Sequence, residues 1–185
     1  KFIQHPKNIQ SFKNRTGREE IIQDNLQLSR IFMAWPISNF KNQRVILGFE
    51  VLASILCEGK SSRFVSVMKE ERNLVESIHL DVYAGEFGGL LVIEAVCNRK
   101  NIKKVENEMN KLINNLIETK DLSEKEINKG LNIVKSNYYF NLETSSEITS
   151  FLGNQLLWGR ENPLKDLSLN LNCWSKKQNF NEVIN

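Results

Sequence analysis

The chain has 185 residues, of which 41% are hydrophobic and 25% are charged, and its formal net charge is +3. This length and composition are typical of one globular domain with a substantial core. The charge is too small to indicate a nucleic acid or an anionic membrane surface as a partner, and the longest apolar run, near residues 90–97, is too short to span a bilayer.

The first part of the sequence predicts an arm followed by strand structure. Residues 1–16 are polar and aperiodic, which indicates a linker or arm from a preceding domain. The rest, residues 17–185, is interpreted as a single domain and, because the chain begins with Lys1, as part of a longer protein. Residues 17–38 predict one or two strands stopped by Pro36. The apolar run 31–35 predicts burial on both faces near the end.

Two helices are predicted next. Apolar residues recur at helical spacing between positions 45 and 56 and predict one amphipathic helix. Gly59 can adopt the left-handed conformation that ends such a helix. Ser61 or Ser62 is then expected to cap a second helix, which runs to about residue 73.

A β-hairpin is predicted from the alternation that follows. Ile78, Leu80 and Val82 fall on one side of a strand, while His79 and Asp81 fall on the other. A glycine-rich loop and a second apolar run complete an antiparallel hairpin over residues 76–97.

Three further helices complete the predicted order. An apolar stripe predicts a long helix over residues 102–116, and Ser123 with Glu126 forms a capping box that begins the next one. A third helix is expected over residues 146–158, ending at Gly159, and the remainder is weakly patterned. This order predicts an α+β domain in which an antiparallel sheet carries helices packed on one face.

Residues suited to catalysis or metal binding are scarce. The two histidines, His5 and His79, belong to no Glu-x-x-His or His-x-x-Glu-His motif, and a metal site needs at least three well-placed ligands. No catalytic residue and no metal ligand is therefore predicted in this chain. The three cysteines, Cys57, Cys97 and Cys173, lie far apart in the sequence and are interpreted as reduced, mostly buried thiols. Reduced thiols slightly favour a cytoplasmic location.

The stretch LCEGKSSRFVSVMKEERNLVES, residues 56–77, resembles a segment of the pitrilysin/insulinase-type zinc peptidases, including their mitochondrial-processing-peptidase-like members. The matching residues are Gly59, Ser61, Ser62, Arg63, Arg72, Leu74 and Ser77. The strand ending AWPIS, the glycine-rich hairpin, the capped helix and the closing LGNQLLWG also follow the family's order, over about residues 17–165.

The resemblance implies a function for the chain. Such peptidases contain α+β domains in tandem, with a His-x-x-Glu-His zinc site in the amino-terminal domain and a metal-free carboxy-terminal domain that closes a chamber around unfolded peptides. This chain resembles the carboxy-terminal domain of such a zinc metalloendopeptidase. It is therefore expected to be inactive alone, to act with its own amino-terminal catalytic domain on a peptide substrate, and to form a homo- or heterodimer with a related chain. The alternatives are a non-catalytic scaffold or partner subunit of the same family, or an unrelated α+β binding module.

The resemblance also implies two positions near the substrate. Some family members carry an Arg and a Tyr that reach the substrate across the chamber, and Lys69 and Glu76 stand at those positions here. Lys69 keeps a cation without the planar fork of Arg, and Glu76 cannot supply the neutral hydroxyl donor of Tyr. Four other motif residues are assigned structural roles: Gly59, Ser61, Ser62 and Arg63. Arg63 is expected to tie its helix to a neighbouring element.

Overall fold

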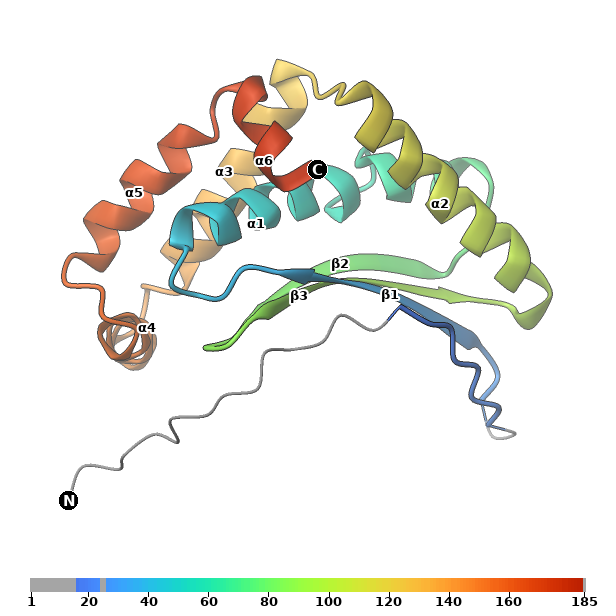
Figure 1. Cartoon of the computed structure of the whole chain (residues 1–185), viewed down its shortest axis with the longest axis horizontal. Helices are drawn as coiled ribbons and strands as arrows, with labels where there is room; N and C mark the ends of the chain where they lie inside the picture. Colours follow the sequence, from blue (N-terminus) through green and yellow to red (C-terminus); the bar gives the residue numbers. More distant parts are fainter. Residues whose placement is uncertain (1–15, 24–25, 185) are drawn as a thin grey trace.

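The computed structural model describes residues 16–23 and 26–184. The predicted arm, apart from its last residue, and His5 lie outside the described residues. The described chain forms two layers, in which a three-stranded antiparallel sheet carries helices on one face and leaves the other face open (Figure 1). The predicted α+β class, with helices on one face of an antiparallel sheet, is therefore confirmed.

The sheet has the strand order β1-β3-β2, built from β1 (Ser29–Ile37), β2 (Ser77–Ala84) and β3 (Gly89–Cys97). β2 and β3 form the predicted antiparallel hairpin, and β1 pairs antiparallel with β3 over its whole length. Pro36 lies within β1 rather than ending it. A proline is tolerated there because β1 has a neighbour on one side only among the described strands.

The strand before the first helix is shorter and less buried than predicted. Residues 17–23 and 26–28 form no strand, so a single strand begins at Ser29. The prediction of burial on both faces near residues 31–35 is wrong, because Phe32 is 60% exposed. Phe32 points to the face that carries no helix, whereas Ile31 and Met33 pack against the core.

The central helix, α1 (Gln43–Cys57), lies across the sheet and packs on β2. The side chain of Asn42 accepts a hydrogen bond from the Val45 backbone N–H and caps its first turn. Gly59 has a φ of +82°, which confirms the predicted left-handed residue just beyond the helix end.

The helix after Gly59 differs from the prediction in two respects. Most of it is a π-helix, η1 (Val65–Glu71), which is a rare conformation. Neither serine caps it. The Ser62 hydroxyl donates to the Gly59 carbonyl at 2.7 Å, and the Ser61 hydroxyl accepts from Lys129 Nζ at 2.8 Å. Both hydroxyls therefore stabilise the turn, and the first N–H groups of the helix receive no side-chain cap.

The next helices follow the prediction closely. A short 3₁₀ turn, η2 (Arg99–Asn101), leads into α2 (Ile102–Thr119). The capping box of Ser123 and Glu126 is present and begins α3 (Glu124–Phe140). A second capping box begins α4 (Ser145–Leu157), which ends before the left-handed residue Gly159. α2 packs on β1 and β3, while α3 packs on α1.

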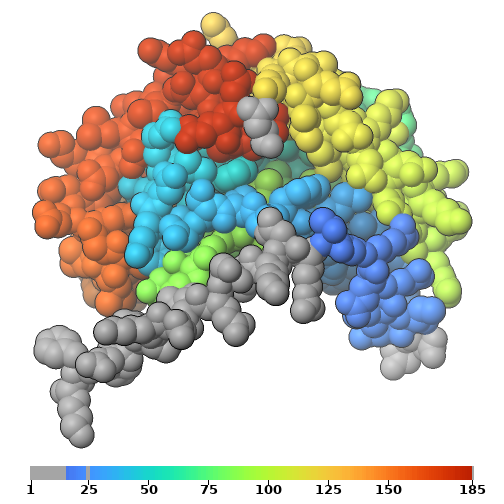
Figure 2. Space-filling model, viewed as in Figure 1, coloured from blue at the N-terminus to red at the C-terminus, as the bar shows by residue number. Residues whose placement is uncertain are grey.

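The weakly patterned end of the sequence forms ordered helices. These are α5 (Pro163–Cys173), a 3₁₀ turn η3 (Lys177–Phe180) and α6 (Asn181–Ile184). Trp174 is fully buried, and its Nε1–H donates to the Arg44 carbonyl at 2.7 Å. In Figure 2 this C-terminal segment (red) and the start of α1 (blue to cyan) form one continuous surface above the strands.

The cysteines and the helix lengths can be compared directly with the sequence-based predictions. Cys57 and Cys97 are buried and Cys173 is exposed, and all of them are free thiols. Within the part of the chain that the structure describes, no helix combines the length and the apolar character needed to cross a membrane.

Candidate functional site

The segment that carries the family resemblance is fixed to the helical layer by Arg63. Its guanidinium forms two hydrogen bonds with Glu126, Nε to Oε1 at 2.6 Å and Nη2 to Oε2 at 2.9 Å, and also donates to the Asp121 carbonyl. The bond from Arg63 is the main cause that lowers the pKa of Glu126 to about 2, and Ser123 adds to the effect. Arg63 thus joins the segment to the start of α3, as expected.

Lys69 and Glu76 are both exposed, the first on η1 and the second in the link between η1 and β2. The Glu76 backbone N–H donates to the Val96 carbonyl at 2.8 Å, so the link joins the sheet just before β2 begins. Neither residue lines a large cavity of the described chain that lies elsewhere on the molecule.

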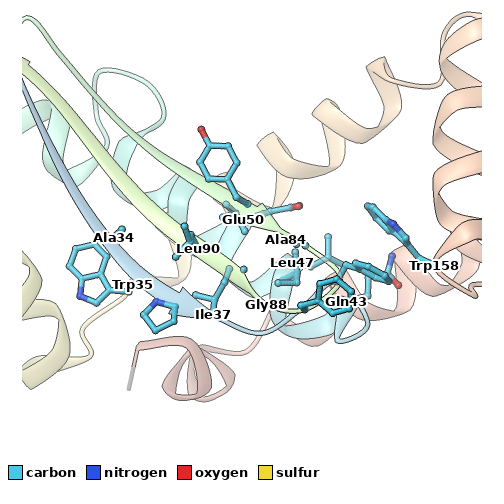
Figure 3. Close-up of a pocket in the computed structure, with 18 of the residues that line it drawn as sticks. Ala34, Trp35, Ile37, Gln43, Leu47, Glu50, Ala84, Gly88, Leu90 and Trp158 are labelled. Atoms are coloured by element: carbon cyan, nitrogen blue, oxygen red, sulfur yellow. The ribbon is translucent and has the colours of Figure 1, made fainter. Parts of the chain in front are cut away.

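That cavity has a volume of about 1440 Å³ and opens where the end of β1 and the β2–β3 loop face α1, α3 and α4. We call it the aromatic cavity. Its aromatic lining residues are Trp35, Phe40, Tyr83, Phe87, Tyr138, Phe151 and Trp158. In Figure 3, Trp35 and Trp158 lie at opposite ends of the view, with Leu47 and Glu50 of α1 between them. Large apolar cavities with a few polar groups are the usual place for ligands.

One wall of the aromatic cavity is a layered arrangement of two rings and a guanidinium group. The rings of Phe40 and Trp158 stack with their centroids 4.8 Å apart, and the guanidinium of Arg160 lies 5.2 Å from the Trp158 ring centroid. Arg160 also donates to the side chain of Gln155 and to the Phe40 carbonyl. These contacts hold the wall together, and Gln155, which also lines the cavity, is 6% exposed.

The lining of the aromatic cavity also contains a partly buried carboxyl group, that of Glu50. The Tyr138 hydroxyl donates to Glu50, at 3.2 Å to Oε1 and 3.1 Å to Oε2. Burial raises the pKa of Glu50 to about 7, and the Tyr138 hydrogen bond and the charge of Arg160 only partly offset this rise. Burial, followed by the charge of Glu50, also raises the pKa of Tyr138.

Glu50 was not among the site residues expected from the sequence. The signal was present, because Glu50 is an acidic residue inside the apolar stripe of a helix that is buried over most of its length. Carboxyl groups in such positions are uncommon unless they are paired or functional.

The side chains that line the aromatic cavity are suited to binding. The described residues that line it include no histidine and no cysteine. Aromatic walls can hold apolar side chains, while Gln155, Arg160 and Glu50 can exchange hydrogen bonds with polar groups such as a peptide backbone.

Comparison with known proteins gives one family match. The family described as the peptidase M16 inactive domain matches residues 2–134. None of the curated proteins matches the chain.

Several solved structures share the fold. A protease from Helicobacter pylori is 19% identical, with a TM-score of 0.74, over 88% of this chain and 39% of its own. A chain of complex III2 from Candida albicans, with Inz-5 bound, is 20% identical, with a TM-score of 0.74, over 88% of this chain and 40% of its own. The present chain thus spans well under half the length of both.

A third structure is matched over most of its length. The inactive peptidase domain of a candidate zinc protease from Bordetella parapertussis is 11% identical, with a TM-score of 0.73, over 85% of this chain and 84% of that one. At such identities these structures establish the fold alone.

Proposed function

This chain belongs to the family of peptidase M16 inactive domains, and from that premise we propose that it is the carboxy-terminal, substrate-enclosing domain of a zinc-dependent endopeptidase. In this proposal it forms one wall of the chamber that holds an unfolded peptide. The observation that carries the proposal is the family match over residues 2–134. The chemistry of the aromatic cavity, which suits binding, supports it.

The zinc ion of the proposed peptidase belongs to another part of the protein. Among residues 16–23 and 26–184, no three His, Cys, Asp or Glu side chains are grouped so that they could hold a metal ion. His79 is exposed on β2, without a second histidine beside it in the described chain. The donor set therefore does not fit zinc, and the resemblance assigns the metal to a His-x-x-Glu-His half outside this chain.

In this proposal the aromatic cavity contributes binding energy. An extended peptide presents alternating side chains, and apolar ones gain free energy when aromatic walls cover them. Gln155 and Arg160 are fixed by their mutual hydrogen bond, so they can meet backbone groups of a peptide without further ordering. Binding of this kind positions a substrate for a reaction that occurs elsewhere.

Lys69 remains the residue of the motif segment best placed by resemblance to touch the peptide. It is exposed and carries a cation that can donate to a peptide carbonyl. Glu76, also exposed, can accept hydrogen bonds but cannot replace a tyrosine hydroxyl as a neutral donor. We therefore propose contact with substrate for both, without a catalytic step.

A non-catalytic scaffold or partner subunit of the same family is the second candidate function. The likeness to a chain of complex III2 favours it, because that structure is an assembly of subunits. The two candidates differ in whether the complete protein cleaves peptides, and either one allows a homo- or heterodimer with a related chain.

Peptide binding at the aromatic cavity can be tested by substitution of Trp158. We expect Trp158→Ala to weaken binding of a fluorescent, unstructured, apolar peptide by about tenfold. The substitution removes the indole ring that stacks on Phe40 and Arg160 and forms part of the cavity wall. Leu157→Ala is the matched control, since Leu157 is the neighbouring residue, is 84% exposed and lies outside the cavity lining. Equal affinity of the two variants, measured by fluorescence anisotropy, would exclude the cavity as the peptide site.

A further inference from the structure

A smaller pocket, of about 310 Å³, adjoins the aromatic cavity, because Glu50, Val82 and Tyr138 line both. It lies where the last turns of α1 meet β2 and α3, and we call it the acidic pocket. Its volume is at the lower end of the range of ligand sites, which begins at about 300 Å³.

Two carboxylates that form no salt bridge with any described residue line the acidic pocket. Glu58 comes from the end of α1 and Asp81 from β2, and both are exposed. The salt bridges of the described chain involve other acidic residues. Both carboxylates act on the same thiol, since their charges, after burial, raise the pKa of Cys57. The C-terminal end of α1 adds a partial negative charge at this place.

The floor of the acidic pocket holds a buried hydroxyl group whose hydrogen-bonding capacity is unused. Ser54 is 1% exposed, and its Oγ has no hydrogen-bond partner among the described residues. Ser54 lies four residues before Glu58 and four after Glu50, so the three share one face of α1. A buried polar group without a partner is uncommon and destabilising, and it indicates a missing partner.

We propose that the acidic pocket binds the ammonium group of a lysine side chain, carried by a peptide held in the aromatic cavity. The inference rests on the proposed function, since it names one feature of the peptide. A lysine ammonium has three N–H donors and accepts none, which matches the two carboxylates and the Ser54 hydroxyl. A metal ion fits less well, because no suitable group of three ligands occurs in the described chain.

Lys129 and Arg160 are cations near the acidic pocket, and each has other partners. Lys129 Nζ contacts the Glu58 carbonyl at 3.4 Å and the Ser61 hydroxyl at 2.8 Å, and it does not line the pocket. Arg160 acts on Glu50 from the aromatic cavity, where it is bound to Gln155. Since no salt bridge of the described chain uses Glu58 or Asp81, their carboxylates are left for a ligand.

The test uses two fluorescent peptides of one unstructured sequence, the first with a central lysine and the second with that lysine Nε-acetylated. We expect the protein to bind the lysine peptide about tenfold more tightly. The double variant Glu58→Gln/Asp81→Asn should lose this preference and keep its affinity for the acetylated peptide. Glu118→Gln, which removes an exposed charge on α2 outside the pocket, should keep the preference.

Ser54→Ala provides a second variant with two opposite effects. It should weaken binding of the lysine peptide and raise the melting temperature of the free protein, because the unpaired hydroxyl is gone. Equal affinity of the unmodified protein for the two peptides would overturn the lysine pocket while peptide binding stands. A loss of preference in Glu118→Gln equal to that in the double variant would also overturn it. Failure of both peptides to bind would overturn the lysine pocket and the proposed function together.

Discussion

The carboxyl group of Glu50 lies in the wall shared by the two cavities, where burial raises its pKa from 4.5 to about 7. Below pH 4.5 this group is protonated in both the folded and the unfolded chain. Between pH 4.5 and 7 the unfolded chain releases the proton while the folded chain keeps it, so the free energy of unfolding falls as the pH rises. Above pH 7 the free energy of unfolding is lower by the full amount, about 3 kcal/mol.

The substitution Glu50→Gln tests whether this carboxyl group titrates between pH 4.5 and 7 in the folded protein. Glutamine keeps an acceptor for the Tyr138 hydroxyl and cannot ionise, so the variant should match the unmodified protein near pH 4.5 and be more stable by up to about 3 kcal/mol at pH 8. Urea unfolding at the two pH values measures both differences. Glu118→Gln, which changes an exposed residue, should leave the pH dependence unaltered. The same stability difference at both pH values would show that Glu50 does not titrate in this range.

Residues whose conformation depends on local chemistry could be predicted from the sequence. Gly59 ends α1 in the left-handed conformation because glycine alone adopts it without strain, and Ser123 with Glu126 caps α3. The prediction that Ser61 or Ser62 caps a helix was wrong, since each hydroxyl has another partner. The choice among such partners depends on tertiary structure, which spacing does not encode.

The close approach of α1 and the end of α5 depends on one glycine. A Cβ atom at Gly48 would lie 2.2 Å from Cζ2 of Trp174, which is closer than any real contact. Trp174 also donates to the Arg44 carbonyl and packs against Phe180, so the C-terminal segment is held to α1 through this ring. A methyl group at Gly48 must displace it.

Gly48→Ala should therefore destabilise the protein, by about 1–3 kcal/mol, the usual cost of overpacking a core. Gly153→Ala is the matched control, because Gly153 is also helical, in α4, and a Cβ there meets nothing within 4 Å. It should be neutral or stabilising by up to about 1 kcal/mol, since alanine favours helix. Thermal unfolding followed by tryptophan fluorescence measures the stability of each variant. Equal stabilities would mean that Trp174 is not packed on Gly48.

At the element scale, the hairpin and the capped helices could be predicted because their signals lie within a few neighbouring residues. α5 could not, because Leu164 and Leu169 are 50% and 57% exposed and obscure the helical period of Leu167 and Leu171. The packing of α5 depends on the contact between Trp174 and Arg44, which lie 130 residues apart in the sequence. The π-helical form of η1 has no distinct residue pattern either.

For the molecule as a whole, the order of elements was enough to predict the α+β class with an antiparallel sheet, in which the structure joins β1 to the hairpin. The aromatic cavity could not be predicted, because its walls come from β1, the β2–β3 loop, α1, α3 and α4. Lys69 and Glu76, named through the resemblance, lie outside its lining. Whether Lys69 and Glu76 lie near a substrate depends on the rest of the proposed peptidase, so their contact with substrate stays a prediction.

The complete protein also decides between a peptidase and a scaffold. A quenched fluorescent peptide, unstructured and containing lysine, is the suitable substrate, because it reports cleavage by the complete protein and by the 185-residue chain in the same way. Each is assayed with zinc added and again after a chelator.

We expect the complete protein to cleave this peptide, to stop when the chelator removes the metal and to resume when zinc is restored. The 185-residue chain should show no cleavage under any of these conditions, because its described residues contain no group of ligands for zinc. Cleavage by the 185-residue chain itself, or a complete protein that never cleaves, would contradict the proposed role as the inactive domain of a zinc peptidase.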